Sequence, residues 1–419
     1  MKETNEKLNE TATLLSRHPA KHRMRIAIAV LSIASCLCLL PPAIAAPGSW
    51  TQAADLPSPA SATSGCVVDG IVYVIGGLYP YNALPLQAVW AYDPRTNSWT
   101  QKKDMPTARR FLSATAVDGI IYVIGGTGGA WGAQVVLKTV EAYDPKTDTW
   151  VTKAPMPTGR GLHAACTVGG IIYAIGGTAS WPSRLSTVEA YDPKTNQWTT
   201  KRSLPKGIVF PTASVANGLI YAFMGTDTFA YDPQTDQWAA KSQHSPWSYG
   251  LMSSTVDGTI YLFGGMTEDL YGSYDLSLAY DPTQDRFSAR RKMPRTRLLS
   301  VCGVIDGKIY LAGGVSIEPV VNPNPVYYKT VDVFDPQGGV TPQILSLACE
   351  STNHVRVAWQ GEAGLRYGVQ STTKVANGPW TRINFSSGGN SFLATNSLVE
   401  ATCLVPTADT NRFFRVLEL

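Results

Sequence analysis

The feature of this sequence that most limits its fold is a ten-residue segment of the type VDGIIYVIGG, which recurs along most of the chain. Its six copies occupy residues 68–77, 117–126, 168–177, 216–225, 256–265 and 305–314. Five copies end in a Gly-Gly pair, and the fourth has Met224 in place of the first glycine. A single unit of this size cannot bury its apolar face alone, so such units stack on their neighbours. The chain is therefore expected to fold as six similar units.

Each repeat has the pattern of four short strands. The first strand is rich in small residues, as in LSATAV and HAACTV, and an Asp-Gly, Gly-Gly or Asn-Gly pair follows it. Both positions of a two-residue hairpin turn need positive φ, which these residues tolerate. The second strand ends in Gly-Gly, the third contains Tyr-Asp-Pro, and an aromatic residue begins the fourth. Small side chains suit the innermost strand of a radial blade, so the pattern predicts a β-propeller.

The segment GSWTQAADLP, at residues 48–57, has the form of an outer strand although no blade precedes it. The spacing from Trp50 to Gly76 is 26 residues, the same as from Phe287 to Gly313 and in the other repeats. The sixth repeat ends in VDVFDPQGGV and has no outer aromatic of its own. We therefore predict that the strand around Trp50 completes the sixth blade and closes the ring, which removes open sheet edges.

The Gly-Gly pair, the YDPxTxxW segment and the MPTxR segment together resemble the Kelch repeat across residues 48–340. This resemblance implies a β-propeller with a binding face built from loops; most proteins of the family bind partners and a minority are enzymes. The predicted fold is all-β. A six-bladed Kelch β-propeller occupies residues 46–340, and a small C-terminal β-sandwich occupies residues 341–419.

The C-terminal region, residues 341–419, alternates apolar and polar residues between short turns, which predicts a small β-sandwich. Segments such as AWQGEAGLRYGVQST and RFFRV resemble fibronectin type III-like modules at the C-termini of exported bacterial proteins, which are usually accessory. Cys349 and Cys403 would either form a disulfide or remain two buried thiols.

The N-terminal residues 1–45 have the pattern of a secretory signal peptide. A basic KHRMR segment precedes an apolar run from Ile26 to Leu40, and Ala-Ile-Ala precedes Ala46. The apolar run is short for a membrane span, and Met24 is an alternative start. A lipoprotein cleavage site at Cys36 is the less favoured alternative, because apolar residues follow it. The pattern predicts an exported protein located in the periplasm, at the cell surface or outside the cell, with no integral membrane segment after cleavage.

The charge of the mature chain argues against nucleic acid as a partner. Residues 1–45 contain six basic and three acidic side chains, so their removal lowers the formal charge from +4 to about +1. The sequence also contains no metal-ligand, phosphate-loop or nucleophile motif, so we expect no cofactor and no metal. Protein and carbohydrate partners both remain open.

The loops between the second and third strands vary in length, and variable loops on a rigid scaffold are where binding concentrates. They are also rich in aromatic residues, which suit stacking on sugar rings or peptide side chains. The predicted ligand-binding residues of these loops are Tyr79, Tyr81, Trp131, Trp181 and Tyr271. The alternative is that these side chains pack one loop against another.

A second group of candidates lies where each blade begins, at the predicted mouth of the central channel. In proteins of the Kelch family that bind acidic peptides, arginines at this repeat position face the ligand. The residues of this group are Arg109, Arg160, Arg297, Phe210, Trp247 and Tyr249. Arginine binds carboxylates in a directional way, so an anionic partner is one form of this hypothesis. The alternative is that each arginine bonds the backbone of the adjacent blade.

The functional prediction is an exported Kelch-repeat binding protein, and the sequence favours no enzyme. The alternative is a sugar mutarotase or epimerase of the sialic-acid mutarotase type, a class found among exported bacterial Kelch propellers. His163, near Arg160, would then act with the arginines and with Glu268 or Glu318 as acid and base. A buried, hydrogen-bonded histidine is the competing interpretation of His163. The sequence places no carboxylate next to the arginines, which weighs against the enzyme hypothesis.

Overall fold

The structure is a computed structural model of the 419-residue chain. It describes residues 48–78, 84–130, 133–180, 182–269, 271–318 and 322–338, together with the backbone of the strands between residues 343 and 418. The described residues form strands, turns and bridges and contain no helix. None of them therefore forms a helix that could cross a membrane.

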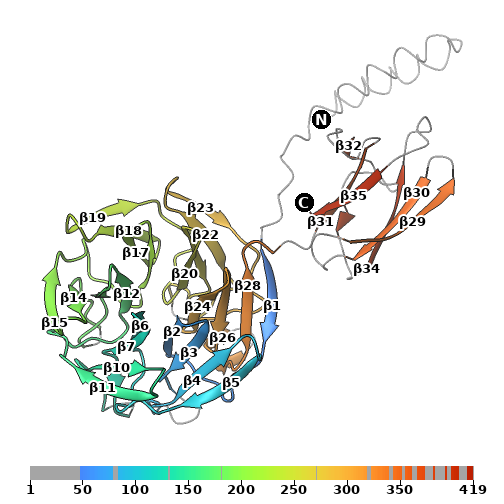
Figure 1. The fold of residues 1–419 in the computed structure, drawn as a ribbon. Helices are drawn as coiled ribbons and strands as arrows, with labels where there is room; N and C mark the ends of the chain where they lie inside the picture. Colours follow the sequence, from blue (N-terminus) through green and yellow to red (C-terminus); the bar gives the residue numbers. More distant parts are fainter. Residues whose placement is uncertain are drawn as a thin grey trace, which may run out of the picture. The chain divides into compact units, whose positions relative to one another are not determined.

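Residues Ala46–Val340 pack as one compact unit, and its strands form six four-stranded antiparallel sheets around an axis (Figure 1). Each sheet is one blade, and we number the blades along the chain. From the innermost strand outward, blades 1 to 3 are β2 (Ser64–Val68), β3 (Ile71–Ile75), β4 (Val89–Asp93) and β5 (Ser98–Lys102); β6 (Ser113–Val117), β7 (Ile120–Ile124), β10 (Val140–Asp144) and β11 (Thr149–Lys153); and β12 (Ala164–Val168), β13 (Ile171–Ile175), β14 (Val188–Asp192) and β15 (Gln197–Lys201).

Blades 4 to 6 repeat this order. Their strands are β16 (Thr212–Ala216), β17 (Leu219–Met224), β18 (Asp227–Asp232) and β19 (Gln237–Lys241); β20 (Met252–Val256), β21 (Thr259–Phe263), β22 (Ser277–Asp281) and β23 (Arg286–Ala289); and β24 (Val301–Ile305), β25 (Lys308–Ala312), β28 (Val331–Asp335) and β1 (Ser49–Ala53). Two short hairpins extend loops of the propeller. In blade 2 the hairpin consists of β8 (Thr127–Gly128) and β9 (Val135–Val136), and in blade 6 it consists of β26 (Val315–Glu318) and β27 (Asn322–Tyr327). The predicted four-stranded meander and six-bladed β-propeller are confirmed.

The strand β1 lies beside β28 as the outer strand of the sixth sheet (Figure 1). The two strands are antiparallel, with Trp50 opposite Phe334. The ring centroids of these residues are 4.9 Å apart. The indole Nε1 of Trp50 donates a hydrogen bond of 3.0 Å to the carbonyl oxygen of Arg291, which follows blade 5. The first described strand therefore contacts two consecutive blades.

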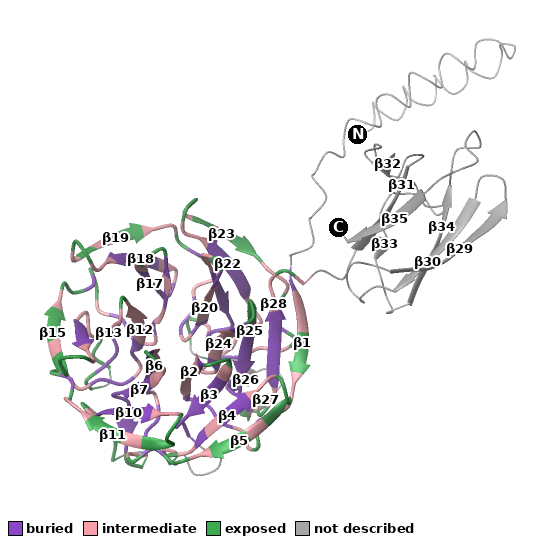
Figure 2. Cartoon of the chain, viewed as in Figure 1, coloured by how far each residue is buried: buried purple, intermediate pink, exposed green. Residues whose placement is uncertain are grey.

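Burial follows the order of the strands within each blade (Figure 2). The second and third strands supply most of the buried apolar residues, whereas the outer strands are largely exposed. The first strands lie close to one another around the axis because their side chains are small. The hydroxyl oxygens of Thr115 in β6 and Thr167 in β12, for example, are 2.9 Å apart. The sequence pattern of small residues thus has the geometric role predicted for it.

Turn chemistry also agrees with the sequence. Asp69 and Gly70, between β2 and β3, have φ values of 51° and 74°. Asn217 and Gly218 have 52° and 78° at the same place in blade 4. Both positions lie in the left-handed region, which Asn, Asp and Gly tolerate better than other residues.

The aromatic residue of each outer strand ties its blade to the preceding one. In blade 2, the indole Nε1 of Trp150 donates to the carbonyl oxygen of Lys103, 2.9 Å away at the end of blade 1. The hydroxyl of Tyr143 donates to Oδ1 of Asp148, and the same oxygen accepts from the backbone N–H of Lys103 at 2.9 Å. The Tyr-Asp-Pro and Trp motifs are therefore structural elements of the blade joints.

Blade 4 departs from the repeat at Met224, and the structure gives the reason. The loop between β17 and β18 is so short that Met224 pairs directly with Asp227 as a strand residue. The residues at the same place in the other blades, such as Gly125, have φ near +60°. A short hairpin keeps this position extended, so a side chain is tolerated.

Seven strands follow the propeller. One sheet contains β29 (Gln343–Ser351), β30 (His354–Gln360) and β34 (Leu398–Leu404), and another contains β31 (Arg366–Thr372), β32 (Thr381–Arg382), β33 (Phe392–Leu393) and β35 (Phe413–Glu418). Cys349 in β29 and Cys403 in β34 are both opposite Val355 of the intervening β30. Two strand spacings separate their Cα atoms by about 9.6 Å. The two predicted alternatives for Cys349 and Cys403, a disulfide or two buried thiols, concern side chains that lie outside the described part of the structure.

Candidate functional site

The loops between the second and third strands and the links between blades share one face of the propeller, which we call the loop face. Five large apolar side chains are markedly exposed among the described residues, and four of them belong to this face. These four are Leu84 of blade 1, Val135 of blade 2, Tyr271 of blade 5 and Val326 of blade 6. The fifth, Val151, lies on the outer strand β11. Among the described residues of the loop face, the exposed large apolar side chains thus belong to blades 5, 6, 1 and 2.

The structure places only part of the predicted aromatic set. Tyr271 is 67% exposed on the loop face. Four other predicted residues, Tyr79, Tyr81, Trp131 and Trp181, lie outside the described residues. Their part in ligand binding stays a prediction.

The three predicted arginines lie at separate blade joints, and each side chain is fully buried. The link that contains Arg160 joins blades 2 and 3. The carbonyl oxygen of Arg160 accepts a hydrogen bond of 2.9 Å from the N–H of Gly126 in blade 2. The Nη1 of Arg160 donates to the carbonyl oxygens of Gly176 and Thr187 in blade 3, at 3.0 and 2.9 Å. Arg160 therefore holds the preceding blade with its backbone and the following blade with its side chain.

Each of these arginines also forms a buried ion pair. Nη2 of Arg160 is 2.8 Å from Oε2 of Glu189, the second residue of β14. The equivalent pairs are Arg109 with Glu141 in blade 2 and Arg297 with Asp332 in blade 6. Burial lowers the pKa of the Arg160 guanidinium, and the nearby Glu189 carboxylate opposes that shift. The sequence alone placed no carboxylate next to the arginines, whereas the structure brings one to each of them.

A signal for these carboxylates was present in the sequence. In blades 2, 3 and 6, which follow an arginine, the second residue of the third strand is acidic. In blades 1, 4 and 5, the joint residue and the equivalent residue of the third strand are both uncharged. These pairs are Ala60 with Trp90, Ile208 with Phe229, and Ser248 with Leu278. The two positions change together from charged to uncharged, as expected for residues that meet in the fold.

The ion pairs bear on the two roles considered for these arginines, which are ligand binding and bonding to the adjacent blade. Their guanidinium groups have no exposed surface, and a ligand would have to replace the carboxylate and backbone partners. The bonding to an adjacent blade, given as the alternative, is present at all three joints. Binding of an anionic ligand by Arg109, Arg160 and Arg297 stays a prediction.

A ring of residues two positions after each joint surrounds the axis, and we call it the collar. Its members are Ala62, Phe111, Leu162, Phe210, Gly250 and Leu299, and all have φ between 53° and 61°. The backbone N–H of Phe111, Leu162, Phe210 and Gly250 each donates to the carbonyl of the preceding collar residue, at 2.9–3.1 Å. Bulky residues rarely adopt this conformation, and such strain is most often found at functional sites. Sequence reasoning identified only Phe210.

The aromatic residues predicted at the mouth lie next to one another beside the collar. The rings of Phe210 and Phe111 lie edge to face with centroids 6.1 Å apart. The ring of Phe210 is 6.4 Å from that of Tyr249, and Tyr249 is 4.1 Å from Trp247. Tyr249 itself is buried, and the guanidinium of Arg184 lies over its ring at 5.7 Å. These contacts bring Phe210, Trp247 and Tyr249 together as one apolar cluster.

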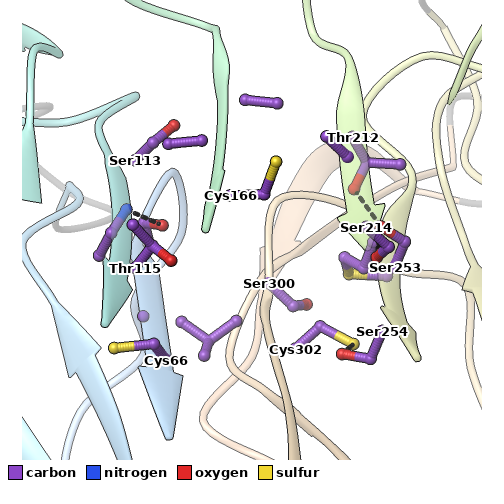
Figure 3. A pocket seen from close by; sticks show the side chains of 18 of the residues that line it. Cys66, Ser113, Thr115, Cys166, Thr212, Ser214, Ser253, Ser254, Ser300 and Cys302 are labelled. Atoms are coloured by element: carbon purple, nitrogen blue, oxygen red, sulfur yellow. Dashed lines mark hydrogen bonds between the residues drawn. The ribbon is translucent and has the colours of Figure 1, made fainter. Parts of the chain in front are cut away.

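Below the collar, the innermost strands of all six blades line a central cavity of about 450 Å³. Hydroxyl and thiol groups from several blades face it, including the labelled Ser113, Thr115, Thr212, Ser253 and Cys302 (Figure 3). Its wall, in the described part of the chain, contains no Asp, Glu, Lys or Arg. Burial raises the pKa of the thiols of Cys66, Cys166 and Cys302 to about 12, so these groups remain protonated.

His163 lines the same cavity and is 6% exposed. Burial, and secondarily the charge of Arg160, lowers its pKa to about 3, so the imidazole is neutral. Neither ring nitrogen has a hydrogen-bond partner among the described residues. The prediction of a buried histidine is confirmed, whereas the hydrogen bonds assumed in that interpretation are not found there. In this part of the chain, no group of three or more His, Cys, Asp or Glu residues is arranged to hold a metal ion.

Comparison with known proteins supports the repeat and the fold. Residues 47–225 match the model of the KLHDC2/KLHL20/DRC7 Kelch-repeats domain. A segment of 41 residues is 46% identical to Kelch-like protein 36 of Rattus norvegicus and of Mus musculus, which is 10% of this chain and 7% of those proteins. The chain therefore matches only a small part of these relatives.

A solved structure, described as the structure of YjhT, has the same fold. It superimposes with a TM-score of 0.56 and 16% sequence identity over 66% of this chain and 95% of that chain. At this identity the likeness concerns the fold alone. The likeness to Kelch repeats covers residues 47–225, which is less than half of the chain.

Proposed function

We propose that this chain is an exported Kelch-repeat binding protein that engages a partner protein through the loop face. The observation that carries the proposal is the concentration of exposed apolar side chains on that face. Leu84, Val135, Tyr271 and Val326 come from four consecutive blades, so a ligand that contacts all of them must be extended. Protein interfaces contain such apolar and aromatic anchors, whereas a small molecule would reach few of them at once.

Two further parts of the proposal concern the rest of the chain. We propose that residues 1–45 direct export and that residues 341–419 form an accessory fibronectin type III-like sandwich. We also propose that β1 closes the ring. The pairing of Trp50 with Phe334 and the hydrogen bond from Trp50 to Arg291 support this closure. Removal of residues 48–53 from the mature chain should then make the whole propeller unfold at a lower urea concentration.

The experiment for the binding function compares the loop face with a matched surface. Mature protein carrying Leu84→Asp, Val135→Asp and Tyr271→Asp is used beside the wild type and a Val151→Asp control in cross-linked pull-downs from the producing cells. Val151 is 54% exposed but belongs to an outer strand. We expect the partner to be captured by the wild type and by Val151→Asp and lost from the triple variant. Equal capture by all three proteins would contradict the proposal, and circular dichroism checks that each is folded.

A further inference from the structure

We infer that the central cavity is a second, separate binding site, and that it takes an uncharged small molecule rich in hydroxyl groups, such as a neutral sugar. This inference does not depend on the loop face, because none of the exposed apolar residues of that face lines the cavity. Its size of about 450 Å³ lies within the range of small-molecule sites.

The first argument is the chemistry of the wall. Hydroxyl groups occur there in close pairs from neighbouring blades: Thr115 with Thr167 at 2.9 Å, and Thr212 and Ser214 with Ser253 at 2.7 and 2.8 Å. The dashed lines in Figure 3 include contacts of this kind. A hydroxyl donates one hydrogen bond and accepts two, so each pair keeps bonding capacity for a third partner. A ligand with several hydroxyl groups matches such a wall at many points.

The second argument is charge. The wall residues include none with a full charge, and the arginines of the blade joints direct their guanidinium groups to carboxylates in the following blades. The histidine and the thiols of the wall are neutral. An ionised ligand would therefore leave water without gaining a counter-charge, which is costly. The cavity should discriminate against a carboxylate-bearing sugar in favour of its neutral counterpart.

The third argument is the collar. Phe111, Leu162, Phe210 and Leu299 lie just before the innermost strands and belong to the wall of the cavity. A pyranose ring has an apolar C–H face and a polar rim, and aromatic rings stack well on the former. The apolar collar above the hydroxyl wall therefore matches the two surfaces of a sugar.

The experiment measures binding by ligand-detected NMR and calorimetry to the mature chain, residues 46–419. The probes are glucose, galactose and mannose, each paired with its own uronic acid. We expect at least one neutral sugar to bind, and its uronic acid to bind about tenfold more weakly or not at all. No binding of any neutral sugar, or tighter binding of a uronic acid, would overturn the inference.

Two variants locate the site. Ser253→Ala removes the hydroxyl group that contacts Thr212 and Ser214. Thr115→Val with Thr167→Val removes two hydroxyl groups at constant shape. Each should weaken binding of the sugar about tenfold, whereas Val151→Asp should retain all of the affinity. Unchanged affinity in both the serine and the threonine variants would exclude the cavity as the site. Since partner capture is measured separately, its failure would not affect this result.

Discussion

The six joints between blades are built in two ways, and the comparison shows what the arginine positions contribute. Before blades 2, 3 and 6, a buried arginine reaches into the next blade and pairs with an acidic residue. Before blades 1, 4 and 5, the equivalent positions are uncharged, and Ile208 packs in an apolar cluster that also includes Phe229. Both solutions form the same backbone hydrogen bond, from the second glycine of the pair or its equivalent to the joint residue. The ion pair is therefore one of two ways in which these joints are filled.

The largest expected effect comes from breaking one ion pair. Arg160→Met leaves Glu189 buried with no cation, and it removes the bonds to Gly176 and Thr187. Removing one member of a buried pair costs about 3–5 kcal/mol, because the remaining charge is uncompensated. The free energy of unfolding in urea should fall by that amount. A loss below about 1 kcal/mol would show that Glu189 finds another partner or takes up a proton easily.

A second prediction tests what both kinds of joint share, which is the close approach of the joint carbonyl to the glycine pair. A Cβ on Gly264 would lie 2.0 Å from the carbonyl oxygen of Arg297, at a φ of +63°. Gly264→Ala should cost about 2–3 kcal/mol, since the backbone must move. Gly258→Ala is the control, because its φ is +77° and its nearest neighbour is 3.8 Å away. The control should lose only about 1 kcal/mol from conformational strain. Equal losses in the two variants would mean that strain alone matters.

A third prediction converts one kind of joint into the other. Arg160→Met combined with Glu189→Leu replaces the ion pair of blade 3 by apolar side chains of similar size. Such replacements are often neutral or stabilising, so the double variant should unfold within about 1 kcal/mol of the wild type. A double-mutant cycle in urea measures the coupling of the two positions. A double variant as unstable as Arg160→Met alone would show that the arginine's backbone bonds, not its charge, hold the joint.

The smallest expected effect concerns the outer part of the joints. There, either an aspartate or an asparagine accepts a hydrogen bond from the tyrosine of the third strand. Asp148 and Asp236 accept from Tyr143 and Tyr231, as Asn196 accepts from Tyr191 in blade 3. The tyrosine hydroxyl, followed by a backbone N–H of the preceding blade, lowers the pKa of both aspartates. A carboxylate with a lowered folded pKa adds stability above its unfolded pKa of about 3.9, and that stability is lost as the pH falls through the folded pKa.

Replacement of both aspartates should therefore remove part of the acid sensitivity. The urea midpoint of Asp148→Asn/Asp236→Asn should resemble that of the wild type at neutral pH and fall less between about pH 5 and pH 3. Parallel pH profiles of the two proteins would mean that these carboxylates titrate alike in the folded and unfolded states.

The architecture of the propeller could be predicted from the sequence because its determinants are local. Asp69-Gly70 and Asn217-Gly218 set the inner hairpins, and the Trp and Tyr-Asp-Pro motifs have a constant spacing. The role of Arg160 could not be decided in this way, since it depends on Glu189, which lies 29 residues further on and meets it only when blade 3 forms. The correlated change at the two positions was the available signal.

The sequence by itself determined the number of blades, the turns, the small residues of the inner strands and the position of the one irregular repeat at Met224. Each of these follows from backbone preference or spacing within about 50 residues. Only the tertiary structure decided that the arginines point into the next blade, and that the collar and hydroxyl groups from six blades surround one neutral cavity. The physical reason is that such a site consists of single residues from each repeat, whose side chains become neighbours only when the ring of sheets packs around its axis.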